Sequence, residues 1–182
     1  SAIMQDFWGE VKPVSGRAAD LFLTLDAFAE EVTRQKTAAE TAIVGSPKHA
    51  RYQTLDAAGL RDGGRASLGL GADEYVVGYF GQNLNWMPGY RETVMDIGRS
   101  AAALDGAKLI YRPHPRERRQ SIEQTMSLLA GAGASPILYE TSKIEAALAL
   151  VDAVVSCFST CGYDALYLAR SSELSLRHDR GG

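Results

Sequence analysis

The sequence lacks several features that would assign it to a specialised class of protein. Its 182 residues contain no run of about eighteen apolar residues, so no segment is predicted to cross a membrane as a helix. No signal peptide opens the chain. The net charge of -3 argues against a nucleic-acid binder held by bulk electrostatics. We therefore expect a cytoplasmic protein, free or associated peripherally with the inner face of a membrane, that binds no nucleic acid.

Residues typical of metal and redox chemistry are also scarce. The only two cysteines, Cys157 and Cys161, are expected to be small buried residues and not a disulfide. The three histidines are scattered, without metal-ligand spacing. There is no Walker loop, and Gly78-Tyr-Phe-Gly81 lacks the third glycine of a dinucleotide fingerprint. No spacing supports a Ser/His/Asp triad. We therefore expect no metal and no bound cofactor.

What the sequence does contain is a series of strand-then-helix units. After residue 70, short apolar runs alternate with segments of helical periodicity. This alternation predicts a parallel sheet with right-handed crossovers, that is, a doubly wound Rossmann-like α/β domain. The expected strands are 74–80, 108–111, 136–139 and 153–158, and the expected helices are 90–104, 117–130, 143–150 and 161–169.

The first seventy residues are predicted to end a preceding α/β domain and to cross into this one. The expected elements are a strand at 19–25, a helix at 26–36 capped by Asp26, a strand at 40–44, a helix at 52–60 and a turn at 61–65. A doubly wound sheet would continue with another strand after residue 170, but 171–182 has only weak strand character, so we expect an incomplete sequence. The predicted divisions are 1–45, 46–70 (the crossing), 71–170 and 171–182 (irregular).

The most informative stretch is Lys108-Leu-Ile-Tyr-Arg-Pro-His-Pro115, an apolar strand that ends in a charged loop. The prolines stop any regular element, so Arg112 and His114 are expected at a strand's carboxyl end, where open α/β sheets bind ligands. Arginine can pair with phosphate in bidentate fashion, and histidine can donate to phosphate or ribose oxygens. The alternative is a structural turn with a satisfied histidine. The following arginines, 116, 118 and 119, indicate either an anionic ligand or a solvated face.

A second candidate site follows the strand at 153–158. Ser156, Ser159 and Thr160 place hydroxyls and free backbone N–H groups at a helix start, an arrangement that binds anions. Plain N-capping by Ser159 or Thr160 is the alternative, and the two roles are compatible. Asp164 either stabilises the helix dipole or bonds a sugar hydroxyl.

A third candidate is the loop after the strand at 74–80. Glycine at position 81 lets a backbone approach a ligand closely, and Gln82 follows it. Both are expected to contribute to the same ligand-binding edge of the sheet.

Taken in order, these motifs resemble the C-terminal, donor-binding half of GT-B glycosyltransferases over residues 41 to 169. More narrowly, the His-Pro and Ser-Thr motifs are similar to those of bacterial sialyltransferases and polysialyltransferases, and of capsule and teichoic-acid polymer transferases. The resemblance implies that His114 and Pro115 match the first motif and Ser159 and Thr160 the second. Asp164 would match an acidic position that is more usually glutamate.

The resemblance implies a metal-independent transferase acting on a nucleotide-sugar, CMP-, CDP- or UDP-linked, and on a glycan or lipid-linked acceptor in polysaccharide synthesis. Residues 71–170 would then bind the nucleotide-sugar. His114 would stabilise the leaving group, and the general base would come from the other domain. A nucleotide-sugar 2-epimerase of the same fold and a non-catalytic nucleotide-binding or assembly module remain as alternatives. The residues do not indicate the oligomeric state.

Overall fold

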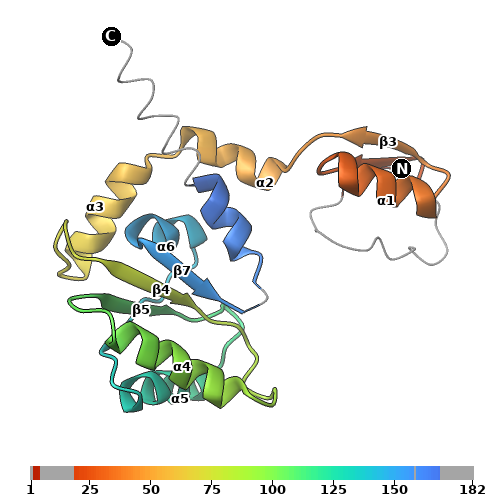
Figure 1. The fold of residues 1–182 in the computed structure, drawn as a ribbon. Coiled ribbons are helices and arrows are strands. Elements are labelled where there is room, and N and C mark those ends of the chain that lie inside the picture. Colours follow the sequence, from red (N-terminus) through yellow and green to blue (C-terminus); the bar gives the residue numbers. More distant parts are fainter. Residues whose placement is uncertain (1, 5–18, 158, 169–182) are drawn as a thin grey trace, which may run out of the picture. The chain divides into compact units, whose positions relative to one another are not determined.

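The computed structural model describes residues 2–4, 19–157 and 159–168, and the chain divides into two compact units, residues 1–54 and 55–182 (Figure 1). The predicted crossing, 46–70, contains the boundary between them. The predicted irregular segment, 171–182, lies outside the described residues. No helix in the described ranges is long and apolar enough to span a bilayer.

The first unit contains a small parallel sheet. Strand β2 (Leu21–Thr24) lies between β1 (Ala2–Met4) and β3 (Glu40–Ile43). Helix α1 (Ala27–Lys36) connects β2 to β3, and the carboxylate of Asp26 accepts a 2.8 Å hydrogen bond from the Ala29 N–H, which confirms the predicted cap. Helix α2 (Pro47–Ala50) and the 3-10 turn η1 (Arg51–Thr54) follow. Strand β1 was not predicted, because three residues are too few to show a period.

The second unit contains the predicted parallel sheet, in the order β6-β5-β4-β7. The strands are β4 (Val76–Phe80), β5 (Lys108–Arg112), β6 (Pro136–Leu138) and β7 (Ala153–Ser156). The chain therefore builds outward from β4 on one side and returns to pair β7 on its other side. This reversal creates a topological switch point between β4 and β7, outside whose carboxyl ends ligands bind in folds of this type.

Helices cover both faces of this sheet (Figure 1). Helices α4 (Tyr90–Ala102) and α5 (Arg119–Gly131) pack together on one face. Helices α3 (Ala57–Ser67) and α6 (Ile144–Leu150) pack together on the other, and residues 161–168 are also helical. The doubly wound, Rossmann-like architecture is thus confirmed.

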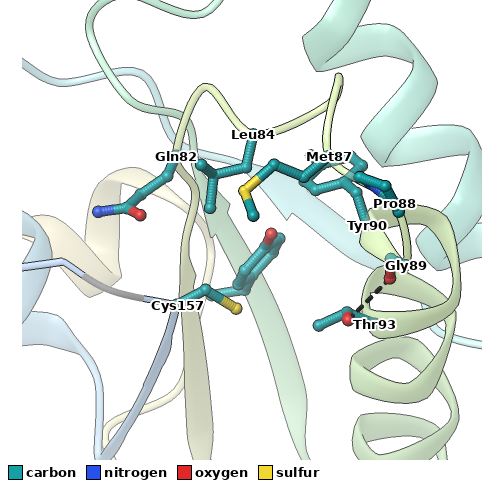
Figure 2. Close-up of a pocket in the computed structure, with 9 residues that line it drawn as sticks. Gln82, Leu84, Met87, Pro88, Gly89, Tyr90, Thr93 and Cys157 are labelled. Carbon is teal, nitrogen blue, oxygen red and sulfur yellow. Dashed lines mark hydrogen bonds between the residues drawn. The ribbon is translucent and has the colours of Figure 1, made fainter.

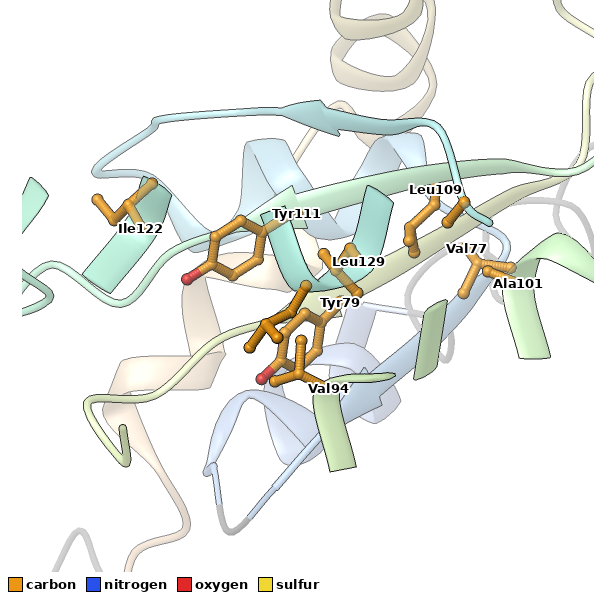
Figure 3. Close-up of a cluster of buried hydrophobic side chains, with 10 residues drawn as sticks. Val77, Tyr79, Val94, Ala101, Leu109, Tyr111, Ile122 and Leu129 are labelled. Atoms are coloured by element: carbon orange, nitrogen blue, oxygen red, sulfur yellow. The ribbon is translucent and has the colours of Figure 1, made fainter. Parts of the chain in front are cut away.

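The core between the sheet and helices α4 and α5 is built around two tyrosines (Figure 3). The rings of Tyr79 and Tyr111, on neighbouring strands, stack with centroids 5.3 Å apart. Helices α4 and α5 approach closely at Gly98, where a Cβ would lie 2.8 Å from the Cβ of Ala132. The side chains that face this core include Val77, Val94, Leu109, Ile122 and Leu129.

Two predicted boundaries are wrong. The Arg-Asp-Gly-Gly-Arg segment, predicted as a turn at 61–65, is the middle of helix α3, because Arg65 is anchored in the protein interior and Gly64 contacts Leu150 of α6. The helix predicted at 117–130 spans Arg119–Gly131 instead. Gly133, with φ of 97°, provides the left-handed residue two positions later.

The amino-terminal edge of the sheet is held by an ion pair between a buried arginine and a partly exposed aspartate. Arg65, which is 2% exposed, donates to the Asp152 carboxylate at 2.7 Å. It also donates to four backbone carbonyls, those of Gly71, Ala72, Glu74 and Leu150. Asp152 in turn accepts from the Val76 N–H at 2.8 Å and pairs with Arg61. The carboxylate of Asp152, the residue directly before β7, therefore joins helix α3 to the first residue of β4.

We expect Asp152→Ala to lower the free energy of unfolding by about 2–4 kcal/mol, because it leaves the buried Arg65 charge and the Val76 N–H without their acceptor. Urea denaturation measures the loss. Asp62→Ala is the matched control, since Asp62 is an exposed residue of the same helix; its effect should stay within about 0.5 kcal/mol. Equal effects of the two variants would contradict this role.

The same carboxylate predicts an acid-sensitive stability. Burial raises the pKa of Asp152, but hydrogen bonds from Val76 and Arg61 and the nearby positive charges outweigh it, so the pKa lies below its usual value. The carboxylate therefore contributes its stability above the unfolded pKa, about 3.9, and loses it as the pH falls through the folded pKa. Below about pH 4, the unfolding free energy of the wild type should fall more steeply than that of Asp152→Asn, as denaturant titrations at several pH values would show.

Candidate functional site

The predicted motifs meet at the carboxyl edge of the sheet. Arg112, Phe80 and Ser156 are register partners at the ends of the adjacent strands β5, β4 and β7. Adjacent strands lie about 4.8 Å apart, so the His-Pro loop and the Ser-Thr segment start about two strand spacings from each other. The Gly81 N–H donates to the Arg112 carbonyl at 2.9 Å and extends the β4–β5 pairing one residue beyond the strand.

Arg112 is a buried cation with an incomplete set of partners. The residue is 8% exposed, and one guanidinium nitrogen donates to the Thr141 carbonyl at 3.2 Å, in the loop after β6. Its Nε is buried without a hydrogen-bond partner. Burial lowers the pKa of Arg112, while the nearby Cys161, Asp164 and Glu117 oppose the shift. Since arginine stays charged in proteins, this edge of the sheet holds an uncompensated N–H donor with a positive charge.

His114 is half-buried in the loop beyond Arg112, with its ring oriented by the backbone. Its Nδ1 accepts a hydrogen bond from the Arg116 N–H at 3.1 Å, which requires the proton of the neutral ring to lie on Nε2. Burial lowers the pKa of His114, and the charges of Arg112 and Arg116 add to this against the opposing charge of Glu117. The described residues provide no partner for Nε2, so a neutral imidazole presents one N–H donor.

Ser156, at the end of β7, and Ser159, beyond it, have identifiable local roles. The Ser156 hydroxyl donates to the Phe80 carbonyl at 3.2 Å and ties β7 to the end of β4. The Ser159 hydroxyl accepts from the Cys161 N–H at 3.2 Å, an N-cap interaction for the helical residues 161–168. Thr160 is exposed. Capping by Ser159, one of the predicted alternatives, is therefore present, and anion binding there stays a prediction.

Among the remaining candidates, Asp164 is buried, whereas Pro115 and the arginines 116, 118 and 119 are exposed. Asp164 is 2% exposed, within reach of the Arg112 charge. Arg119 is largely exposed and pairs with Glu123 at 3.2 Å and Glu140 at 3.3 Å, which is typical of a solvated face. Among the described residues, no group of three or more His, Cys, Asp or Glu side chains is placed to hold a metal ion.

The space beside Gly81 is filled by the protein itself. A Cβ at Gly81 would lie 2.6 Å from a carboxylate oxygen of Glu117 and 2.8 Å from the Tyr111 ring. Glycine is therefore required here for close internal packing. The predicted approach of a ligand to the Gly81 backbone stays a prediction.

A small pocket lies near the carboxyl ends of β4 and β7, where Tyr79 lines it (Figure 2). Its volume is about 120 Å³, below the range of about 300–1,000 Å³ typical of ligand sites. A whole nucleotide would therefore have to extend beyond this pocket. Gln82, predicted as a site residue, lines it together with Tyr79, Leu84, Met87, Pro88, Gly89, Tyr90, Thr93 and Cys157.

Two contributors to the site were not predicted. Glu117 was predicted only as the first residue of the helix at 117–130, although a carboxylate three residues after the His114 N–H has the spacing of a side chain that reaches back to cap a helix start. It accepts from that N–H at 2.7 Å. Thr141 contributes only a backbone carbonyl, for which no signal exists in the sequence.

The parallel order, the switch point and the crossovers define a Rossmann-like domain. Among solved structures, the wall teichoic acid polymerase TagF, a GT-B glycosyltransferase, matches with a TM-score of 0.51 and 16% sequence identity. That structure is a histidine-to-asparagine variant soaked with CDPG. The match covers 82% of this chain and 36% of TagF, so the chain spans about a third of the length of its neighbour. No protein-family model matches the sequence, and neither does any curated protein.

We expect Gly81→Ala to destabilise the protein by about 1–3 kcal/mol through overpacking, since the new methyl group meets the carboxylate of Glu117 and the ring of Tyr111. Thermal denaturation measures the change. Gly131→Ala is the matched control: its Cβ enters open space within helix α5, so it should be neutral or stabilise by up to about 1 kcal/mol. A neutral Gly81→Ala would contradict the packing described.

Proposed function

We propose that this chain is the donor-binding part of a glycosyltransferase that uses a nucleotide-sugar. The observation that carries the proposal is the buried Arg112, with its Nε unpartnered, at the carboxyl edge of the sheet. An unsatisfied buried donor costs about 1–3 kcal/mol, and a ligand phosphate oxygen would remove that cost. The free Nε2–H of His114, from the same loop, adds a second donor for the same kind of group.

The proposed chemistry is displacement at the anomeric carbon of the donor sugar. The acceptor hydroxyl oxygen forms a bond to that carbon, and the bond from carbon to the nucleotide phosphate oxygen breaks. The leaving phosphate keeps the electron pair and gains negative charge. Fixed donors aimed at developing charge lower the barrier to such a step. In this proposal Arg112, His114 and the backbone N–H groups near Ser159 supply that stabilisation without a metal ion.

The proton of the acceptor hydroxyl must go to a base, and we assign that role to the preceding domain. The carboxylates near the donor edge are occupied: Glu117 holds the His114 loop, and Asp164 is buried beside Arg112. The fold likeness to TagF, and the soak of that protein with CDPG, support a cytidine nucleotide as the nucleotide part of the donor. The acceptor we propose is a glycan or a lipid-linked polymer of the cell surface, reached from the cytoplasmic side of the membrane.

Calorimetry with CMP, CDP and UDP tests the proposal. We expect at least one of them to bind and His114→Ala to weaken that binding about 10- to 100-fold, the equivalent of one hydrogen bond to a charged group. The melting temperature should be nearly unchanged, because the described residues give Nε2 no partner and water can replace the bond of Nδ1 to the exposed Arg116 N–H. Arg119→Ala is the control, since Arg119 pairs with exposed carboxylates, and it should bind like the wild type.

Three outcomes would contradict the proposal. Failure of all three nucleotides to bind removes the donor site. A large fall in melting temperature for His114→Ala, with unchanged affinity, assigns the histidine to a structural turn. Conversion of a nucleotide-sugar to its epimer without any acceptor identifies an epimerase in place of a transferase.

A further inference from the structure

We propose that Glu117 is a positioning residue, whose carboxylate holds the His114 loop so that the ring presents its Nε2–H at the carboxyl edge of the sheet. That this N–H binds a nucleotide rests on the proposed function. Its orientation rests only on the hydrogen bonds of the loop. Glu117 carries neither of the predicted motifs, and no direct contact with a ligand is assigned to it.

Both carboxylate oxygens of Glu117 are used. One accepts from the backbone N–H of His114 at 2.7 Å, and the other from the Tyr111 hydroxyl at 2.6 Å. The Glu117 N–H donates back to the His114 carbonyl at 2.9 Å. Glu117 thus closes the turn from His114 to Glu117 twice, once through its backbone and once through its side chain.

This closed turn determines which ring nitrogen of His114 is free. The Arg116 N–H lies inside the turn and donates to Nδ1 of the ring at 3.1 Å. A neutral imidazole that accepts at Nδ1 carries its proton on Nε2. If the carboxylate is removed, the turn keeps only one of its two closures, and the hydrogen bond that selects this form of the ring weakens.

The carboxylate is itself fixed by the core. Tyr111 is fully buried and its ring stacks on Tyr79, so its hydroxyl cannot follow a moving partner. The absent side chain at Gly81 leaves the room that the carboxylate occupies. A continuous set of contacts therefore leads from the aromatic core through Glu117 to the His114 backbone, which is how a loop residue becomes preorganised.

The first experiment reads the ring directly. Long-range 1H–15N correlation spectra distinguish the two neutral forms of a histidine, and His114→Gln assigns the signal among the three histidines. We expect the wild type at neutral pH to show the form protonated on Nε2. Glu117→Ala should give averaged nitrogen shifts, whereas Glu117→Gln, which keeps both contacts with its amide, should retain the wild-type form.

Glu123→Ala is the matched control, because Glu123 lies on helix α5 and pairs only with the exposed Arg119; its spectrum should match the wild type. Glu117→Ala should melt roughly 2–8 °C lower, since it removes the carboxylate that accepts from the buried Tyr111 hydroxyl. Tyr111→Phe removes the contact that fixes the carboxylate but keeps its contact with the His114 N–H. It should therefore change the His114 signal less than Glu117→Ala does, even where the two variants lose similar stability. An unchanged His114 signal in Glu117→Ala would overturn the proposal.

A double-mutant cycle on nucleotide affinity tests the purpose of the positioning. Glu117→Ala should weaken binding of the nucleotide by about tenfold or more, and the pair with His114→Ala should bind no more weakly than His114→Ala alone. Additive losses would show that Glu117 acts on the nucleotide by itself and would overturn the positioning role. If the wild type binds no nucleotide while the spectra change as expected, the proposed function fails and the structural assignment of Glu117 stands.

Discussion

The second unit depends on the pairing of Arg65 with Asp152. β4 and β7 are neighbours in the sheet but are separated in sequence by two complete strand-helix units, so their pairing must overcome a large loss of chain entropy. Asp152 lies directly before β7 and binds the first N–H of β4, while Arg65 fixes the helix before β4 to the same carboxylate. These contacts thus hold β4 and β7 together at their amino-terminal ends.

This closure leaves the opposite edge free for chemistry. The ion pair of Arg65 and Asp152 lies where the strands begin, whereas Arg112, His114, Ser156 and Ser159 lie at or beyond their carboxyl ends. Local interactions also order that edge, such as Ser156 with the Phe80 carbonyl and Ser159 with the Cys161 N–H.

The strand-helix alternation was predictable because buried parallel strands are apolar runs between breakers, and the same reasoning correctly placed Arg112 at a strand end. The ion pair was not predictable. Arg65 follows two glycines, which locally favour a turn, and its carbonyl partner at Leu150 is 85 residues away. Glu117 was hidden for a different reason: its neighbours are arginines, so its sequence context resembles a solvated charged face although its partners are a buried tyrosine and a backbone amide.

Two buried arginines among the described residues of the second unit, Arg65 and Arg112, differ in how fully their N–H donors are satisfied. Arg65 makes five hydrogen bonds and uses all three of its nitrogens. Arg112 is nearly as buried but has one hydrogen bond, to Thr141, and an unpartnered Nε. A buried polar group without a partner calls for an explanation. The proposed anionic ligand is one explanation for Arg112, because a phosphate oxygen would supply the acceptor that Arg65 finds within the protein.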